Sequence, residues 1–422
     1  MAFKESDRQE IDEKLAALIT NSNAIRAVAA AVEGTIGPKG LDIMLVDRFG
    51  EVTITNDGVT ILKQMDINHP AAKMLINIAR AQQEEVGDGT TTATIMAGTM
   101  VQEGANQILK GVPVARVIDG IKLGVKRAEE LLEEKKMDVK GIDDPALRDV
   151  ALIAGREHTD IAELVIEAAK LIGEEKLKSK DFKLKDTIMS RAGAKNEVFT
   201  GIIIDKQKLN KQMPFELKDV KILLIDDALE PEQIAPEALR TEAGFTRHLE
   251  EKEEFKRNIE KIVDLGINLV LVDKNISSDA EEILTDAGVI AVERVSTRDL
   301  EKVAEHTGAK IMKRTGIKKS KEEINEHVGE ADKAFEDRKL KQIRIVGGKG
   351  KPLATILVGA ATEEIVDERE RIAKDAASSL QASINYGIVP GGGALELAIS
   401  RELEREKSKV KGMASYGLDC VI

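Results

Sequence analysis

The sequence predicts a protein of several domains, with helical segments towards both ends and an α/β segment between them. The chain has 422 residues, and a single hydrophobic core stops growing well below that length, so two or three domains are expected. Apolar residues recur at helical spacing from Asp7 to Glu33 and again in several later segments. From 220 to 314, short apolar strands alternate with amphipathic helices, a pattern typical of a parallel α/β sheet.

The composition is that of a globular protein and argues against several classes of function. Hydrophobic residues make up 42% of the chain and charged residues 33%. The formal net charge is −12, the wrong sign for capture of a phosphate backbone, so no nucleic acid is expected as a partner. The one cysteine, Cys420, rules out an intrachain disulfide and fits a reducing compartment. Because the N-terminus is polar and no apolar run approaches a membrane span, we expect a cytoplasmic protein without membrane contact.

The first part of the chain is predicted to combine long helices with one hairpin. The first helix breaks at Gly34, and the alternating residues over 41–62 then predict a β-hairpin followed by a tight Asn56-Asp57-Gly58 turn. The helical period returns over 70–85 and 91–110.

Charged segments mark the borders of the next part. They lie at 134–144 and 174–186 and flank a helical stretch over 145–171, so they are interpreted as domain borders. Strands are then predicted over 220–225, 269–272, 289–292 and 310–312, with helices near 249–265, 278–286 and 298–306.

A long insertion interrupts the α/β alternation between Ala228 and Phe255. A connection of this length inside a compact α/β unit is usually functional or disordered. Its charge alone is explained equally well by a solvated helix with mobile flanks. Beyond a second charged stretch at 318–343, helices are predicted over 363–385 and 394–404.

The strongest local motif is the run from Gly87 to Thr92, Gly-Asp-Gly-Thr-Thr-Thr, just before a predicted helix. Glycines let the backbone approach a ligand, and a helix start points N–H groups outward, so the motif favours a phosphate site. Asp88 would repel a phosphate unless Mg²⁺ lay between them. The alternative is that Asp88 is an N-cap residue in a glycine turn without any ligand.

Other loops carry weaker signals. Thr35 to Gly40 could contact phosphate, but a helix end followed by a proline turn explains it as well. The three glycines in Val389 to Ala394 favour close backbone approach to a ligand. Taken alone, Asp375 is expected to be a surface residue of its helix. The glycine-rich run Gly347 to Pro352 is not a Walker A motif and is interpreted as a turn.

Taken together, the motifs resemble those of the chaperonins, specifically the group II or thermosome-like type. The resemblance covers nearly the whole chain. Asn56-Asp57-Gly58 and the run His69 to Lys73 are found in this type and differ in the bacterial group I type. The motifs that carry the resemblance, in order, are Thr35-Ile36-Gly37-Pro38-Lys39-Gly40, Thr55-Asn56-Asp57-Gly58, His69-Pro70-Ala71-Ala72-Lys73, Gly87-Asp88-Gly89-Thr90-Thr91 and Val389-Pro390-Gly391-Gly392-Gly393.

The resemblance implies a role for each matching residue. Asp88 would be the Mg²⁺ ligand, and Asp57 and Asp375 would position and activate the hydrolytic water in ATP hydrolysis. Residues that would bind ATP are Thr35, Ile36, Gly37, Pro38, Asn56, Gly89, Thr90, Thr91, Thr92, Gly391 and Gly392.

The resemblance also implies the chaperonin fold with three domains. These are an all-α equatorial ATP-binding domain, an α+β intermediate domain, and an α/β apical substrate-binding domain with a helical protrusion near 228–258 that serves as a lid. The equatorial domain would comprise 1–140 and 387–422, the intermediate domain 141–198 and 359–386, and the apical domain 199–358.

The function implied is that of an ATP-dependent chaperone, a subunit of a double ring that encloses and folds non-native polypeptides. Its partners would be non-native clients and identical or paralogous ring subunits, and a built-in lid implies no co-chaperonin. The alternative is a shortened holdase that binds unfolded polypeptides without ATP turnover.

The sequence departs from the group II pattern at two places. Where thermosomes carry a lysine that senses the γ-phosphate, this chain reads Ala151 to Glu157, and Arg156 could supply the charge with a different geometry. This substitution suggests a divergent member, such as a bacterial relative of the archaeal type. The chain also stops at Ile422, where the family continues through the equatorial domain, so it is expected to be incomplete at the C-terminus.

Overall fold

The computed structural model describes residues 5–37, 40–46, 50, 52–232, 241–351, 353–362 and 365–422. The chain divides into two compact units. We call residues 1–162 and 374–422 the helical unit and residues 163–373 the sheet unit. The divisions fall within two helices, α7 (Thr159–Ile172) and α13 (Val366–Tyr386). The three-domain division is finer than this partition and stays a prediction.

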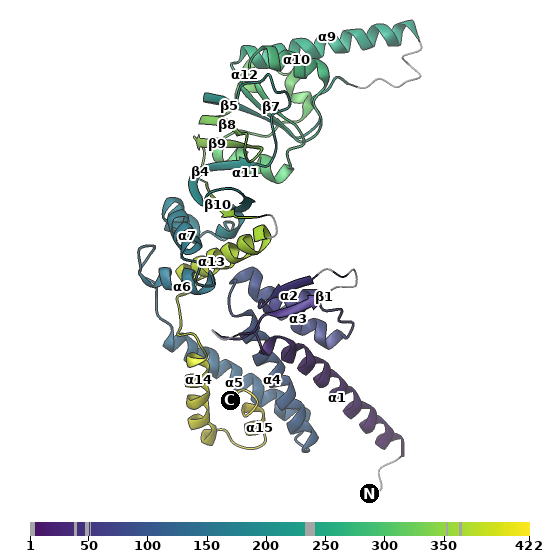
Figure 1. Ribbon diagram of the computed structural model, residues 1–422. Coiled ribbons are helices and arrows are strands. Elements are labelled where there is room, and N and C mark those ends of the chain that lie inside the picture. Colours follow the sequence, from purple (N-terminus) through teal and green to yellow (C-terminus); the bar gives the residue numbers. More distant parts are fainter. Residues whose placement is uncertain are drawn as a thin grey trace. The chain divides into compact units, whose positions relative to one another are not determined.

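The helical unit contains most of the long helices that the sequence predicts, and these helices are confirmed. The hairpin is confirmed too, with antiparallel pairing of Met44 to Ile54 (Figure 1). The elements of the unit other than the parts of α7 and α13 are α1 (Glu5–Glu33), β1 (Ile43–Val46), β2 (Val52–Thr55), α2 (Gly58–Gln64), α3 (Pro70–Glu85), α4 (Thr90–Leu109), α5 (Val114–Lys135), α6 (Ala146–Ala154), α14 (Ala394–Glu406), η5 (Lys407–Lys409) and α15 (Ala414–Leu418).

Helices α1, α2 and α3 share one aliphatic core. Val32, Leu62 and Leu75 are buried in it. Helix α4 approaches this core closely because Gly98 has no side chain: a Cβ there would lie 2.7 Å from the Cβ of Ala29. The middle of α4 therefore packs closely against α1.

One stretch of α1 is more apolar than the sequence analysis anticipated. Among the described residues, Leu15–Glu33 is the helical segment long and apolar enough to cross a membrane. Val28 and Val32 in this stretch are buried against α2 and α3, so packing accounts for part of its apolar character.

A second cluster joins α5 to the C-terminal helices. Leu131 of α5 packs with Leu395, Ile399 and Leu403 of α14. Beside them, the Arg127 guanidinium donates two hydrogen bonds, of 2.8 and 3.0 Å, to the carboxylate of Glu406. A two-point Arg–carboxylate pair fixes orientation as well as distance, so α14 has a defined place on α5.

The sheet unit is built on one mixed sheet of eight strands (Figure 1). The strand order is β3-β10-β4-β9-β8-β5-β6-β7. The strands are β3 (Ile188–Ala192), β4 (Glu197–Ile204), β5 (Glu216–Ile225), β6 (Leu269–Val272), β7 (Ile290–Val292), β8 (Gly329–Asp337), β9 (Gln342–Gly348) and β10 (Ala354–Ala360). The remaining helices and turns of the unit are α8 (Glu174–Leu177), η1 (Leu184–Thr187), α9 (Glu242–Asp264), α10 (Ser278–Asp286), α11 (Thr297–Thr307), η3 (Arg314–Lys318) and α12 (Lys321–Asn325).

The predicted parallel arrangement is correct for three strands and wrong for the whole sheet. Strands β5, β6 and β7 are parallel, whereas β8 pairs antiparallel with both β5 and β9. The predicted strand over 310–312 is a single parallel bridge between Ile225 and Met312. The charged stretch 318–343 contains the whole of β8, whose charged residues concealed its strand character.

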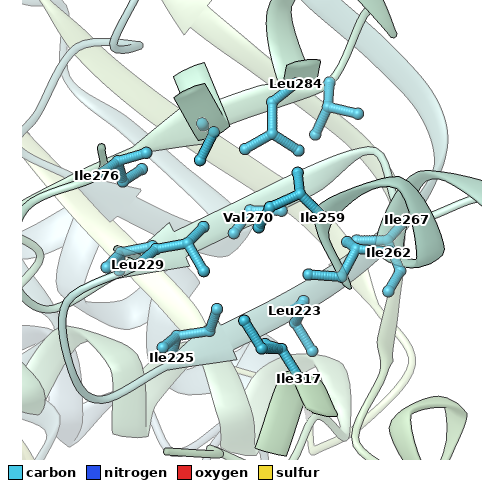
Figure 2. Close-up of a cluster of buried hydrophobic side chains, with 14 of the residues drawn as sticks. Leu223, Ile225, Leu229, Ile259, Ile262, Ile267, Val270, Ile276, Leu284 and Ile317 are labelled. Atoms are coloured by element: carbon cyan, nitrogen blue, oxygen red, sulfur yellow. The ribbon is translucent and has the colours of Figure 1, made fainter. Parts of the chain in front are cut away.

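The parallel strands are buried on both faces, which explains their continuous apolar sequence. Leu223 and Ile225 of β5 point into a core with α9 and α10, seen in Figure 2 beside Ile259. Ile222 and Leu224 point to the opposite face, where α11 contributes Leu300. Alternate residues of one strand thus serve two cores.

The predicted insertion 228–258 becomes helix α9 from Glu242 onward, and residues 233–240 lie outside the described part of the chain. The second half of α9 is anchored by Phe255, Ile259 and Ile262, whereas the first half is mostly exposed. Lys318 forms ion pairs with Glu251 and Glu254, near the middle of α9, and with Glu232 before the helix.

The glycine-rich run at 347–350 packs on a buried histidine. Gly348 N donates to the Nε2 of His306 at 3.1 Å, and the Nδ1 lies 3.4 Å from the Lys351 carbonyl oxygen. A Cβ on Gly348 would lie 2.6 Å from the His306 ring. Both ring nitrogens face groups that suit the neutral imidazole. Burial lowers the pKa of His306, and the Lys176 charge lowers it further, against the opposing effect of the Lys351 carbonyl.

Acid is expected to destabilise the fold through His306. Below its ordinary pKa of about 6.5, the unfolded chain binds a proton that the folded imidazole does not. The free energy of unfolding therefore decreases as the pH is lowered, by up to about 1.4 kcal/mol per pH unit for this group. Thermal melts of wild type and His306→Gln between pH 7.5 and 5.5 measure this, with a weaker pH dependence expected for the variant. His248→Gln on α9 is the control, and an equal pH dependence in His306→Gln and wild type would contradict the assignment.

Candidate functional site

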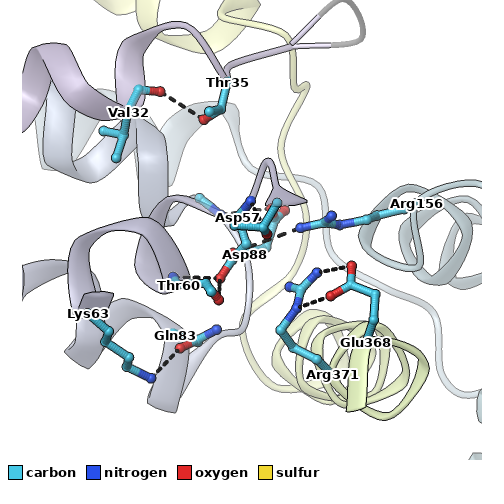
Figure 3. A network of polar contacts seen from close by, with 12 residues as sticks. Val32, Thr35, Asp57, Thr60, Lys63, Gln83, Asp88, Arg156, Glu368 and Arg371 are labelled. Carbon is cyan, nitrogen blue, oxygen red and sulfur yellow. Dashed lines mark hydrogen bonds and ion pairs between the residues drawn. The ribbon is translucent and has the colours of Figure 1, made fainter. Parts of the chain in front are cut away.

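Asp57 is held in one orientation at the start of α2. It is the N-cap residue, and its Oδ2 accepts hydrogen bonds from the amide N of Thr60 at 2.9 Å and from the Thr60 Oγ1 at 2.6 Å. Its own amide donates to the Thr55 Oγ1 at 3.1 Å. The side chain is buried. These bonds account for one carboxylate oxygen and leave the Oδ1 on the side that faces Arg156 (Figure 3).

Asp88 lies in a tight turn between two glycines with left-handed backbone angles. Gly87 and Gly89 have φ angles of 78° and 71°, a region that favours glycine. The N-cap of α4 is Gly89, and Asp88 instead accepts the Gly89 N–H on its Oδ1 at 2.7 Å. The carboxylate is exposed. Asp88 is therefore not the N-cap residue, and the turn presents its carboxylate next to the start of a 20-residue helix.

The start of α4 has the character of an anion site. The first N–H groups of a helix have no partner within it, and the helix dipole adds positive potential there. Gly89 places no side chain over these groups. Thr90, Thr91 and Thr92 all lie in the first turn and are partly accessible.

Close contacts bring three parts of the sequence to this point. A Cβ on Gly58, next to Asp57, would lie 2.6 Å from the Thr91 Oγ1, so the Asp57 turn lies against the start of α4. A Cβ on Gly87 would lie 3.2 Å from the backbone oxygen of Asp375 on α13. The structure thus gathers Asp57, the Asp88 turn and the Asp375 segment. Asp375 itself is half-buried rather than the surface residue that its sequence alone suggests.

Arg156 adds a cation in a strained conformation. Its Nη2 lies 4.0 Å from the Asp57 Oδ1. After α6, the Glu157 amide donates to the Leu152 carbonyl and the Arg156 amide to that of Ile153, the two bonds of a Schellman motif. Arg156 occupies the left-handed position of this motif with a φ of 51°, which glycine normally fills. An arginine there implies a backbone cost of about 1 kcal/mol.

The other predicted ATP-binding residues lie in three places. Thr35 is buried, and its Oγ1 donates to the Val32 carbonyl at 2.8 Å (Figure 3). Ile36 is exposed and Gly37 has a positive φ of 82°, whereas Pro38 lies outside the described residues. Asn56 is half-buried directly before Asp57.

Gly391 and Gly392 lie in the exposed turn before α14. No protein atom lies within 4 Å of a Cβ built on either residue, so packing within the described chain does not require glycine there. The contacts described above, which bring Asp57, Gly87 and Asp375 together, do not involve this turn.

Sequence reasoning missed several residues that support the site. The Gln82 Nε2 donates to the Asp88 carbonyl at 2.8 Å, and Ser378 and Ser379 of α13 contact the turn before Asp88. Thr60, which bonds Asp57 twice, was missed as well. None of these residues belongs to a glycine motif, so no sequence signal pointed to them.

The arrangement fits a phosphate ligand with its divalent cation. Mg²⁺ in proteins is commonly held by one or two carboxylates together with phosphate oxygens, and the exposed Asp88 carboxylate lies next to the helix start that suits phosphate. Within the described part of the chain, no group of three or more His, Cys, Asp or Glu side chains is placed to hold a metal.

The chain is similar to known proteins over most of its length. Residues 28–421 match the model of the TCP-1/cpn60 chaperonin family. A thermosome subunit of Pyrococcus horikoshii is 36% identical over 421 residues, which cover 94% of this chain and 75% of the relative. The thermosome subunit beta of Archaeoglobus fulgidus is 36% identical over 417 residues, with the same coverage. The crystal structure of a group III chaperonin in the open state is 45% identical and superposes with a TM-score of 0.90, covering 97% of this chain and 83% of that one.

We expect Arg156→Gly to be more stable than Arg156→Ala by about 1 kcal/mol, because both remove the charge but only glycine relieves the left-handed backbone. The ion pair with the buried Asp57 is lost in both variants and therefore cancels from the comparison. Urea denaturation of the two variants measures the difference. Equal free energies of unfolding would show that Arg156 is not strained.

Proposed function

Because the chain belongs to the TCP-1/cpn60 chaperonin family, we propose that it is an ATPase subunit of a double-ring chaperonin that encloses and folds non-native polypeptides. It has the chaperonin fold. One observation supports the ATPase part most strongly: Asp57, the Asp88 turn and the Asp375 segment, far apart in the sequence, meet at the start of α4. A carboxylate at a phosphate-binding helix start suits Mg-ATP, and two more acidic residues suit the handling of a water molecule.

Binding of the nucleotide would rest on α4. We assign its first N–H groups and the hydroxyls of Thr90 to Thr92 to the phosphates. Asp88 would hold Mg²⁺, which when bound neutralises phosphate charge in phosphoryl transfer. Thr35 to Pro38, Asn56 and Gly391-Gly392 are assigned to the nucleotide from their motifs.

Hydrolysis needs a water placed in line with the γ-phosphate and an acceptor for its proton. Asp57 is suited to placing the water, because Thr60 fixes its Oδ2 and the carboxylate does not turn. Asp375 is assigned as the proton acceptor. Arg156 offsets the negative charge of Asp57 and is assigned as the sensor of the γ-phosphate.

The remaining parts of the proposal concern assembly and clients. The sheet unit would supply the apical domain over 199–358, and the exposed first half of α9 would form the lid, so that no co-chaperonin is needed. The names of the Archaeoglobus relatives, thermosome subunits alpha and beta, denote parts of an assembly. We propose a ring of identical or paralogous subunits in the cytoplasm.

We expect Asp375→Ala to bind Mg-ATP with nearly wild-type affinity and to hydrolyse it at least about 100-fold more slowly, since a proton acceptor contributes about 10²–10⁴-fold. Binding of a fluorescent ATP analogue and release of phosphate measure the two effects. Asp367→Ala, at an exposed position two turns earlier on α13, is the matched control. Equal turnover in Asp375→Ala and wild type would refute the role.

The 422-residue chain is expected to run as a particle of many 46.0 kDa subunits in size-exclusion chromatography with light scattering, with and without Mg-ATP. A monomer in both conditions would contradict the ring. Full suppression of client aggregation without nucleotide, together with no ATP turnover, would favour the alternative of a non-cycling holdase.

A further inference from the structure

We infer that Ser378 and Ser379 of α13 are positioning residues for the hydrolysis reaction. They fix Asp375 relative to the turn that carries Asp88. The inference rests on the proposed ATPase function and adds residues that neither the sequence motifs nor the family match assigns.

The turn before Asp88 touches α13 at two points. A Cβ on Gly87 would lie 2.6 Å from the Cβ of Ser378 and 3.2 Å from the backbone oxygen of Asp375. The backbone of the turn therefore lies directly on the helix. One residue earlier, the Ser379 Oγ donates to the Val86 carbonyl at 3.4 Å. Both serines are at least 92% buried, with exposures of 8% and 4%.

The same turn is held from the opposite end by α3. The Gln82 Nε2 donates to the Asp88 carbonyl oxygen at 2.8 Å, and the amides of Val86 and Gly87 donate to the Gln82 carbonyl at 2.9 and 3.2 Å. The turn is thus a fixed support, and α13 is placed by contact with it.

The small side chains of α13 make this close approach possible. Ala376, Ala377 and Ser378 follow Asp375 and are buried. On another side, the Ala376 Cβ lies 3.7 Å from the position of a Cβ on Gly155, next to Arg156. Helix α13 is therefore placed against both the Asp88 turn and the end of α6, within one turn of Asp375.

Spacing on the helix links this contact to the chemistry. Ser378 and Ser379 lie three and four residues after Asp375, one helical turn away. A rigid helix that is pushed away from Gly87 carries Asp375 with it. A misplacement of about 1 Å at a reacting group costs about 100-fold in rate, whereas binding of the nucleotide at α4 does not require α13 to stay in place.

The test uses Ser378→Val in the full chain, which replaces the hydroxyl of this buried side chain by two methyl groups next to the Gly87 backbone. We expect kcat for ATP hydrolysis to fall by about 10- to 100-fold with the Kd for the Mg-bound fluorescent ATP analogue within threefold of wild type. Ser378→Ala keeps the Cβ and should retain most of the rate. Asn385→Val places the same side chain on an exposed part of α13 and should leave the rate unchanged.

Hydrogen exchange of the nucleotide-free protein separates positioning from unfolding. Ser378→Val should raise exchange of the α13 amides around Asp375 and leave the Val86 to Gly89 turn and the cores of α3 and α4 protected. A wild-type kcat in Ser378→Val, or equal loss of binding and hydrolysis, would overturn the inference. If the wild-type protein binds Mg-ATP but does not hydrolyse it, the proposed function and this inference both fail. Turnover in wild type that Ser378→Val leaves intact sinks the inference alone.

Discussion

The turn at Gly87-Asp88-Gly89 is the constraint around which the helical unit is arranged. Its two glycines adopt left-handed backbone angles, and one of them lets α13 lie directly on the chain. The turn also ends α3 and begins α4, so its shape sets the angle between two long helices. Because Asp57 and Asp375 are both placed by contacts with this region, the relative position of three acidic residues follows from one local conformation.

The negative charges of Asp57 and Asp88 have different surroundings. Asp57 is buried and relies on two hydrogen bonds from Thr60 and on the nearby Arg156. Asp88 is exposed and faces a helix start, where the dipole favours a negative charge. One carboxylate is thereby fixed by the protein, while the other stays accessible to a ligand. This division suits a site in which one acid shapes the chemistry and another receives a cation.

The sequence predicted most of the long helices because their apolar residues recur regularly, although it named no helix over α5. It predicted β5 to β7 because they are apolar throughout. It missed β3, β4, β9 and β10, and it missed β8, whose pattern is obscured by Glu330, Asp332 and Lys333. At the site, the glycine motifs drew attention to individual loops but did not indicate which of them meet in the fold. The Gly87–Ser378 contact joins residues far apart in the chain and leaves no local pattern. The strain at Arg156 was hidden too, because Gly155 looks like the residue that should end α6.

The uneven anchoring of α9 has an evolutionary consequence. The inner half of the helix carries Phe255, Ile259 and Ile262 in the core, so sequence change there is limited by folding. The outer half has few buried residues, and its substitutions leave the stability of the sheet unit almost unaffected. Substitutions in the outer half are therefore limited by its binding partners rather than by folding. Related chains can carry different surface residues there on the same folded sheet unit.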